Sequence, residues 1–258
     1  MITRSSASEA VASAVDRLPC VGLAEVTEQA SLRTRDERKY LVPVGRFAEL
    51  IGRLPPRYAV LEIGDKRGFA YESVYFDTPD LLTYRQHLQG RRRRFKVRTR
   101  AYLDSAACVF ELKLKGSRDQ TIKARLPYRV ADRKRITPLA QSFLDSELKQ
   151  TYGQSVPHMA AMLTTAYRRT TLVDLEREAR LTCDVDLICT GNDRTVRGLA
   201  KYVLVESKSV GARNDADVAL HRLGLRSVQL SKYCVAVALL DPAIRSNPWH
   251  RTLRRYFS

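Results

Sequence analysis

The chain has 258 residues, and 45 Lys and Arg against 28 Asp and Glu leave a formal net charge of +17. This length allows one large domain with its own core, and the charge favours phosphate-rich partners through long-range attraction. The longest strongly apolar stretch, Cys234 to Leu240, is much shorter than the roughly 18 residues that cross a bilayer, so no membrane span is predicted. The five cysteines form no CxxC pair. They favour buried thiols in a reduced, cytoplasmic protein over a disulfide framework or a zinc site.

Residues 1–32 are expected to form a polar, loosely ordered leader, in which Ala7, Val11 and Val15 recur at helical spacing. Eight strands are predicted after it, at residues 34–42, 71–77, 94–102, 108–115, 120–127, 165–173, 179–188 and 202–208. Helices are predicted at residues 44–53, 81–89, 138–163 and 218–223, and turns at 78–80, 104–105 and 191–192. Residues 231–240 form a mostly apolar final segment.

Several of these strands alternate charged with apolar or uncharged residues. In the strand at 94–102, Lys96, Arg98 and Arg100 share one face, while Val97 and Thr99 share the other, because successive side chains point to opposite sides. The arrangement recurs at residues 35–42, 109–115, 180–186 and 203–208. It predicts an α+β fold in which an antiparallel eight-stranded barrel encloses a basic lumen and the helices pack outside.

The simpler alternative is a sheet whose charged face is in contact with water. A solvated face usually mixes Thr, Ser, Gln, Lys and Glu, whereas these strands favour Arg and Lys with sparse Glu. Arg and Lys bind phosphate oxygens, and carboxylates among them suit a divalent metal. The pattern therefore indicates a lumen that holds a polyanion.

The segments resemble, in order, the VTC-type polyphosphate polymerase domain, a branch of the CYTH-like triphosphate tunnel metalloenzymes. The resemblance spans residues 37 to 233 and is carried by ERKY at 37–40, SVYFDTP at 73–79, Tyr84 with His87 and Gly90, KVRTRAY at 96–102, FELK at 110–113, YRR at 167–169, RLTCD at 180–184, VESK at 205–208 and SKY at 231–233. It implies a tunnel domain at residues 33–245, followed by a basic C-terminal tail at 246–258.

This resemblance implies an enzyme that transfers the terminal phosphate of ATP to a growing polyphosphate chain, with Mn²⁺ or Mg²⁺ as cofactor. The SPX domain and membrane segments of the eukaryotic members are not found in the sequence, so a stand-alone bacterial type is expected. A membrane partner protein remains open. The implied phosphate ligands are Lys39, Arg98, Arg100, Lys113, Lys123, Arg169, Arg180, Lys208 and Lys232.

The resemblance also places Ser231 and Lys232 next to the transferring phosphate, and the implied catalytic residues are Lys232, Ser231, Arg98, Arg100, Lys113 and Arg169. It implies Glu206 as the metal ligand, with Glu37 and Glu111 as further candidates. Two structural alternatives stay open. Glu206 could simply pair with Lys208, and the SKY segment could begin a strand.

Two other functions remain open for the same lumen. With water as the acceptor it would be a tri- or polyphosphatase, and without turnover it would be a polyanion-binding module. Nucleic acid is not expected as a partner, because the charges alternate inward and no aromatic stacking platform lies between them. The basic run at residues 91–94 is interpreted as solvated or as part of the lumen mouth.

Overall fold

The computed structural model describes residues 6–30, 36–116, 121–191, 193–210 and 213–257. The predicted strand positions 34, 35 and 120 and the turn position Asn192 lie outside these ranges. The helices are α1 (Ser6–Val15), α2 (Leu23–Ala30), α3 (Val44–Gly52), α4 (Leu82–Leu88), α5 (Pro138–Tyr152), α6 (Asp215–Arg222), α7 (Lys232–Leu240) and α8 (His250–Tyr256), with short 3-10 helices η2 (Val130–Asp132) and η3 (Asn247–Trp249).

One 11-stranded sheet dominates the structure, and its main path runs β2-β11-β9-β8-β4-β5-β6-β7 with every neighbouring pair antiparallel. The strands are β1 (Cys20–Val21), β2 (Asp36–Pro43), β3 (Tyr58–Leu61), β4 (Phe69–Asp77), β5 (Phe95–Tyr102), β6 (Ala107–Lys115), β7 (Thr121–Tyr128), β8 (Ala160–Asp174), β9 (Ala179–Thr190), β10 (Thr195–Gly198) and β11 (Tyr202–Ser209). The main path contains the eight predicted strands, so the α+β antiparallel class is confirmed.

The short strands β1, β3 and β10 were not predicted, and the helix predicted at residues 138–163 is too long. Helix α5 ends at Tyr152 because Gly153 adopts a left-handed conformation with φ of 66°, which a glycine reaches without steric cost. The chain then enters β8 at Ala160.

The sheet curls but does not close within the described residues. Glu37 of β2 and Lys113 of β6 approach to 3.8 Å, although five strands separate β2 from β6 along the sheet. No described residue of β2 pairs with β7, so the predicted closed barrel is instead open along this edge. Both edge strands carry charged side chains, among them Lys39 and Lys123, and charges on an edge strand oppose direct strand pairing.

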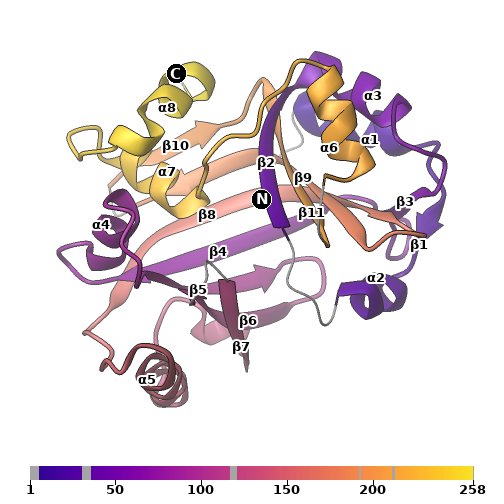
Figure 1. The fold of residues 1–258 in the computed structure, drawn as a ribbon. Helices are drawn as coiled ribbons and strands as arrows, with labels where there is room; N and C mark the ends of the chain where they lie inside the picture. The colour runs from indigo at the N-terminus through magenta and orange to yellow at the C-terminus, as the bar shows by residue number, and fades with distance from the viewer. Residues whose placement is uncertain (1–5, 31–35, 117–120, 192, 211–212, 258) are drawn as a thin grey trace.

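The outer face of the curled sheet is apolar and covered by helices on two sides (Figure 1). Residues of β2, β9 and β11, such as Tyr40, Cys183 and Val205, pack in one core cluster with α1, α3 and α6. Residues of β4, β5 and β6, such as Val97 and Phe110, pack in a second cluster with α5. The strands therefore turn their charged faces inward, as the alternation predicted.

Helix α7 covers one end of the inner face. Its sequence is apolar nearly all round, which is typical of a helix buried on every side. Leu41, Tyr75 and Leu204 belong to the inner-face positions of their strands and pack in one cluster with α7, α4 and Trp249. The final apolar segment is thus a helix that begins at Lys232, and the alternative of a strand start is wrong.

The expectation of a loosely ordered leader does not hold for α1. Ala7, Val11 and Val15 of α1 are at most 2% exposed and lie in the main core cluster, because their helical spacing forms one apolar stripe. Residues of the predicted basic C-terminal tail are also packed. Trp249 is 6% exposed, and the Tyr256 ring contacts the Tyr202 ring.

All five cysteines are free thiols, as predicted, and only Cys20 is exposed. In the part of the chain that the structure describes, no helix combines the length and the apolar character needed to cross a membrane.

Candidate functional site

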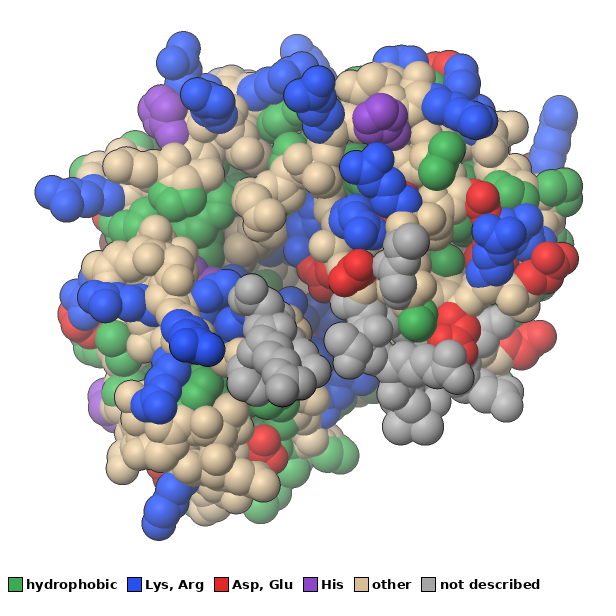
Figure 2. Space-filling view, in the orientation of Figure 1, with side chains coloured by type: hydrophobic (Ala, Val, Ile, Leu, Met, Phe, Trp, Pro, Cys, Tyr) green, Lys and Arg blue, Asp and Glu red, His purple; other side chains and the backbone are tan. Residues whose placement is uncertain are grey.

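The predicted phosphate-binding residues converge on the concave inner face of the sheet, which we call the lumen. Figure 2 shows Lys and Arg side chains around and inside a hollow at the centre of this face of the molecule. The strand registers explain the convergence, because Arg98 lies opposite Glu111, Glu206 opposite Lys39, and Arg169 opposite Asp184. Directly opposed residues of paired strands point to the same side of the sheet.

Asp184 of β9 links the sheet to α7. Its carboxylate accepts two hydrogen bonds from the Arg169 guanidinium, from Nε at 2.6 Å and Nη2 at 2.8 Å, and a third from the Lys232 ammonium. Asp184 is fully buried, and burial by itself would raise its pKa, but Arg169 and Lys232 outweigh that effect and lower it. The ionised carboxylate therefore orients both cations.

A second group joins β2 and β11. Glu206 is 8% exposed and pairs with Lys208 at 2.7 Å, while Glu37 pairs with Lys39. Burial would raise the pKa of Glu206, but Lys208 and Lys39 hold it well below its usual value. Lys208 lies opposite Glu37 and Lys39 opposite Glu206, so the two carboxylates are diagonal neighbours on one face of the strand pair. Burial and the charge of Glu206 oppose ionisation of Glu37, but Lys113 and Lys39 outweigh them and lower its pKa.

Glu111 of β6 stands apart from these carboxylates, in a group of cations. It is 1% exposed and lies 2.7 Å from Arg98, 2.7 Å from Lys123 and 3.0 Å from Arg125, with Arg100 at 3.8 Å. Burial opposes ionisation here too, but the surrounding cations lower the pKa of Glu111 strongly. Its position is that of a counter-ion which holds several cations together.

The N-terminus of α7 enters the lumen beside β5. Ser231 caps the helix by accepting from the Cys234 N–H, and the Lys96 ammonium donates to the same Ser231 Oγ at 2.8 Å. Burial, reinforced by nearby Lys113 and Lys39, lowers the pKa of Lys96 to about 8. A helix N-terminus carries a partial positive charge and free N–H donors, so this end of the lumen is suited to an anion.

Tyrosine rings form the wall between the cations. Lys232 Nζ lies 4.5 Å from the centroid of the Tyr167 ring, and the Arg169 guanidinium lies 5.2 Å from that of Tyr71. Cations at these distances are attracted to the electron-rich ring face, which holds them in place without adding negative charge. The rings therefore position the cations and leave their charge available to a ligand.

The structure brings the predicted phosphate-binding residues together. Every predicted cation and Ser231 lies among the lumen residues, since each interacts with at least one other member. Asp184, Lys96 and Tyr167 are among the lumen residues to which no functional role was assigned from the sequence. Lys96 lies on the same face of its strand as Arg98. Asp184 lies on the same face as Arg180 and Thr182, so both positions follow from the strand alternation. The role of Tyr167 depends on contacts with α7.

The three predicted metal carboxylates do not form one group. Among the described residues there is no cluster of three or more His, Cys, Asp or Glu that could hold a metal ion. Glu37 and Glu206 together supply hard oxygen donors, which fit Mg²⁺ or Mn²⁺ when substrate phosphates complete the coordination. Glu111 is surrounded by cations instead.

Asp77 has the structural role expected of a turn and cap residue. Its buried carboxylate accepts from the backbone N–H groups of Thr83 and Tyr84, at 2.8 and 3.0 Å, in the first turn of α4. It also accepts from the Tyr233 hydroxyl. Asp77, the last residue of β4, thereby joins α4 to α7.

The solved structures that match this chain include a conserved hypothetical protein from Pyrococcus furiosus, which is 12% identical in sequence. The match covers 78% of this chain and 99% of that chain, with a TM-score of 0.43. HpAC1 from Hippeastrum, described as having a dominant triphosphatase activity, is 14% identical to this chain. That match covers 78% of this chain and 94% of HpAC1, with a TM-score of 0.41. Similarities of this size carry no argument about function. No curated protein sequence matches the chain.

A family model gives the decisive comparison. The model of the VTC domain matches residues 34–241, a range that begins just before β2 and ends after α7. It therefore includes every strand and helix that contributes a lumen residue. The chain belongs to the VTC domain family.

Proposed function

We propose that this protein is a polyphosphate polymerase that transfers the terminal phosphate of ATP to a polyphosphate chain held in the lumen. The observation that carries the proposal is the inward-facing cluster of cations on paired strands. Arg100 and Arg169 are each 8% exposed, and guanidinium groups at such depth are expensive unless they meet anions. The lumen cations exceed the carboxylates Glu37, Glu111, Asp184 and Glu206, which leaves charge for bound phosphates.

Phosphoryl transfer needs positioning and charge neutralisation more than covalent chemistry from the protein. In the proposed reaction a terminal oxygen of the chain attacks the γ-phosphorus of ATP, a new P–O bond forms, and the bond to the β–γ bridging oxygen breaks to release ADP. Arg98, Arg100 and Arg169 would bind equatorial oxygens through their guanidinium forks. Lys232 and the N-terminus of α7 would stabilise charge at the transferring phosphate.

Glu206 and its diagonal neighbour Glu37 would hold Mg²⁺ or Mn²⁺ against the substrate phosphates. A divalent ion bound there supplies charge neutralisation and orients the phosphates for in-line transfer. The protein's own contribution at this point is to keep both carboxylates ionised, and Lys208 and Lys39 lower the pKa of Glu206 for that purpose.

The surplus of cations favours polymerase over hydrolase, because a polymerase must hold a triphosphate and the end of a second chain together. The test is to incubate the purified protein with ATP and Mn²⁺, with and without short polyphosphate, and to follow products by gel and phosphorus NMR. We expect long chains, and a shorter lag when short polyphosphate is added. Release of free phosphate alone would indicate a phosphatase, and tight chain binding without turnover across a range of metals would indicate a binding module.

Lys232 provides the matched variant for this assay. Lys232→Ala should lose elongation before it loses polyphosphate binding, because its ammonium lies at the N-terminus of α7 and other cations still hold the chain. The control is Lys149→Ala, which removes an exposed lysine from α5 on the outer face. Equal activity of the two variants would exclude Lys232 from the transfer step.

A further inference from the structure

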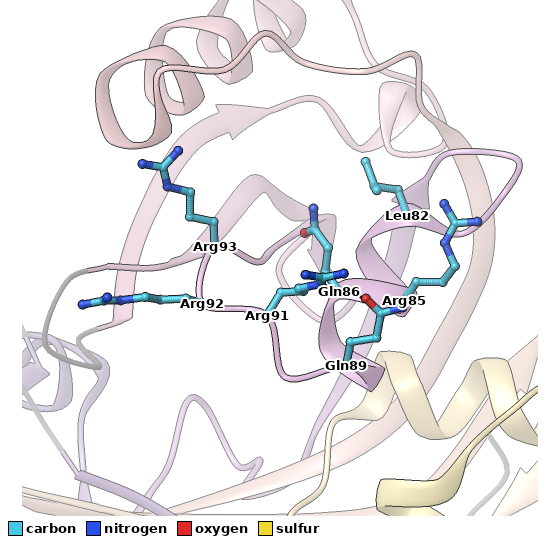
Figure 3. Close-up of a pocket in the computed structure, with 7 residues that line it drawn as sticks. All are labelled: Leu82, Arg85, Gln86, Gln89, Arg91, Arg92 and Arg93. Atoms are coloured by element: carbon cyan, nitrogen blue, oxygen red, sulfur yellow. Dashed lines mark hydrogen bonds between the residues drawn. The ribbon is translucent and has the colours of Figure 1, made fainter.

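A second basic site lies outside the lumen, where α4 connects to β5. A pocket of about 640 Å³ is lined by Leu82, Arg85, Gln86, Gln89 and the three consecutive arginines at 91–93. None of the lining residues is Asp or Glu. We call this group the arginine pocket, and Figure 3 shows its side chains projecting from the helix and from the segment that follows it.

The end of α4 gives the pocket its shape. Gly90 adopts a left-handed conformation with φ of 62°, and the N–H of Arg91 donates to the Gln86 carbonyl at 2.9 Å. This helix-ending turn folds the chain back along the last turn of α4. Arg91 and Gln86 consequently line the same pocket, although the residues are five positions apart in the sequence (Figure 3).

The charges of the pocket are poorly compensated by the protein. The partners of Arg91 and Arg93 are neutral, namely the Gln89 amide oxygen at 2.8 Å and the Tyr152 carbonyl at 3.2 Å. Arg92 has no ion-pair partner among the described residues, and only Arg85 pairs with a carboxylate, that of exposed Asp80. Like charges held this close repel one another unless an anion joins them.

Gln86 adds an independent sign of a ligand site. Its buried Oε1 has no hydrogen-bond partner among the described residues. A buried amide oxygen without a partner is costly, whereas rotation of the same amide group by half a turn would present two N–H donors to an anion. The pocket thus offers guanidinium and amide donors together, which is the donor set that binds phosphate oxygens.

The arginine pocket is close to the lumen along the chain. Arg93, the last of its arginines, precedes Lys96 by three residues, and the Lys96 side chain lies on the inner face of β5. Three extended residues span about 10 Å. Lys96 in turn contacts Ser231 at the N-terminus of α7. A chain whose end reacts beside Ser231 could therefore extend from the lumen toward the arginines.

We propose that the arginine pocket binds a segment of the polyphosphate chain outside the lumen while the chain end lies beside α7. This inference rests on the proposed function of the lumen. No lining residue is aromatic, so the pocket has no platform for a nucleobase, which favours a phosphate chain over nucleic acid. The site would keep a long chain bound between successive transfers.

The test compares ligands of different length. The double variant Arg91→Ala/Arg92→Ala should bind inorganic tripolyphosphate like the wild type, since that ligand fits the lumen alone, but should lose about tenfold in affinity for long-chain polyphosphate. The matched control is Arg129→Ala/Lys134→Ala, which removes two exposed cations beyond β7, near the Tyr102 end of β5 and away from the pocket. Affinities are measured by calorimetry at two salt concentrations.

The outcomes separate this proposal from the proposed function. Unchanged long-chain affinity in the double variant, or the same loss in the control, would overturn the arginine pocket as a chain site. Loss of long-chain affinity in the double variant but not in the control would support the arginine pocket as a chain site. This holds even if ATP yields no polyphosphate, in which case only the polymerase assignment fails. Binding of the wild type to phosphatidylserine vesicles, lost in the double variant while polyphosphate binding persists, would overturn the proposal in favour of a membrane surface.

Discussion

The two sides of the lumen balance their charges differently. On the side formed by β5, β6 and β7, a single carboxylate, Glu111, is surrounded by four cations. On the side formed by β2, β8, β9, β11 and α7, the carboxylates Glu37, Asp184 and Glu206 alternate with cations, and Glu37 and Glu206 are diagonal neighbours on the β2–β11 pair. The first side is therefore suited to anions alone, and the second can share an anion with a divalent cation.

This contrast assigns different roles to residues of the same type. Glu111 neutralises a cluster that would otherwise repel itself, so its loss should disturb stability and phosphate affinity together. Glu206 shares its face with a second carboxylate, Glu37, and the lysines around them keep both ionised, so the two together offer oxygen donors to a cation.

The largest expected effect concerns the metal. Glu206→Gln should lower metal-dependent turnover by at least about a hundredfold, because one charged ligand is lost while the fold stays intact. Glu111→Gln is the control and should retain the wild-type dependence of rate on Mn²⁺ concentration. Rates are measured across a Mn²⁺ titration, with tripolyphosphate affinity measured in parallel. A shift in Mn²⁺ dependence in the Glu111 variant alone would reverse the two roles.

Asp184 should matter for stability as well as rate. Asp184→Asn leaves buried Arg169 without its carboxylate and should lower the free energy of unfolding by about 3 kcal/mol. Tripolyphosphate should restore more stability to this variant than to the wild type, because the ligand replaces the missing anion. Denaturant unfolding with and without ligand measures both effects. The control is Glu49→Gln, which breaks an exposed ion pair and should change the free energy of unfolding little. An equal loss of stability in this control would refute the special role of Asp184.

Arg98 and Arg100 should differ although both face Glu111. Each change to Met should weaken tripolyphosphate binding by about tenfold, through loss of one guanidinium fork. Without ligand, Arg98→Met should lower the melting temperature because it breaks a 2.7 Å contact with Glu111. Arg100 is 3.8 Å from Glu111 and its buried Nε has no hydrogen-bond partner, so Arg100→Met should raise the melting temperature. Melting temperatures that shift in the same direction in both variants would argue against Arg100 as the positive charge that Glu111 leaves uncompensated.

The smallest effect is a pH dependence that Lys96 introduces. Since its pKa is lowered to about 8, the lumen loses one positive charge as the pH rises through 8, and tripolyphosphate affinity should fall by a few-fold there. The free energy of unfolding should instead rise with pH. Between pH 8 and about 10 the unfolded chain binds this proton more tightly, so unfolding becomes less favourable as the pH rises.

Calorimetry in buffers of different ionisation enthalpy offers a direct check on Lys96. At pH 8, binding of tripolyphosphate should be accompanied by proton uptake, because an anion favours the ammonium form. Lys96→Arg keeps the charge at every accessible pH and should abolish both the uptake and the fall in affinity. Proton uptake that persists in this variant would assign the titration to another group.

The local sequence determined which side of each strand faces the lumen. Residues of a strand alternate between two faces, so the positions of Lys96, Arg98 and Arg100 could be predicted from spacing alone. The same rule placed Glu206 with Lys208 on the inner face. Turn residues were readable for a similar reason, because Gly90 ends α4 where its left-handed conformation is required.

Tertiary structure alone decided how these faces meet. The curl that brings Glu37 to Lys113, the packing of α1 against the sheet and the contact of Lys96 with Ser231 join residues far apart in the chain. Local patterns contain no information on such distances, since they depend on how all the apolar faces are buried together. Residues 231–240 likewise became a helix because α7 is enclosed on every side by the sheet, α4 and the C-terminal residues.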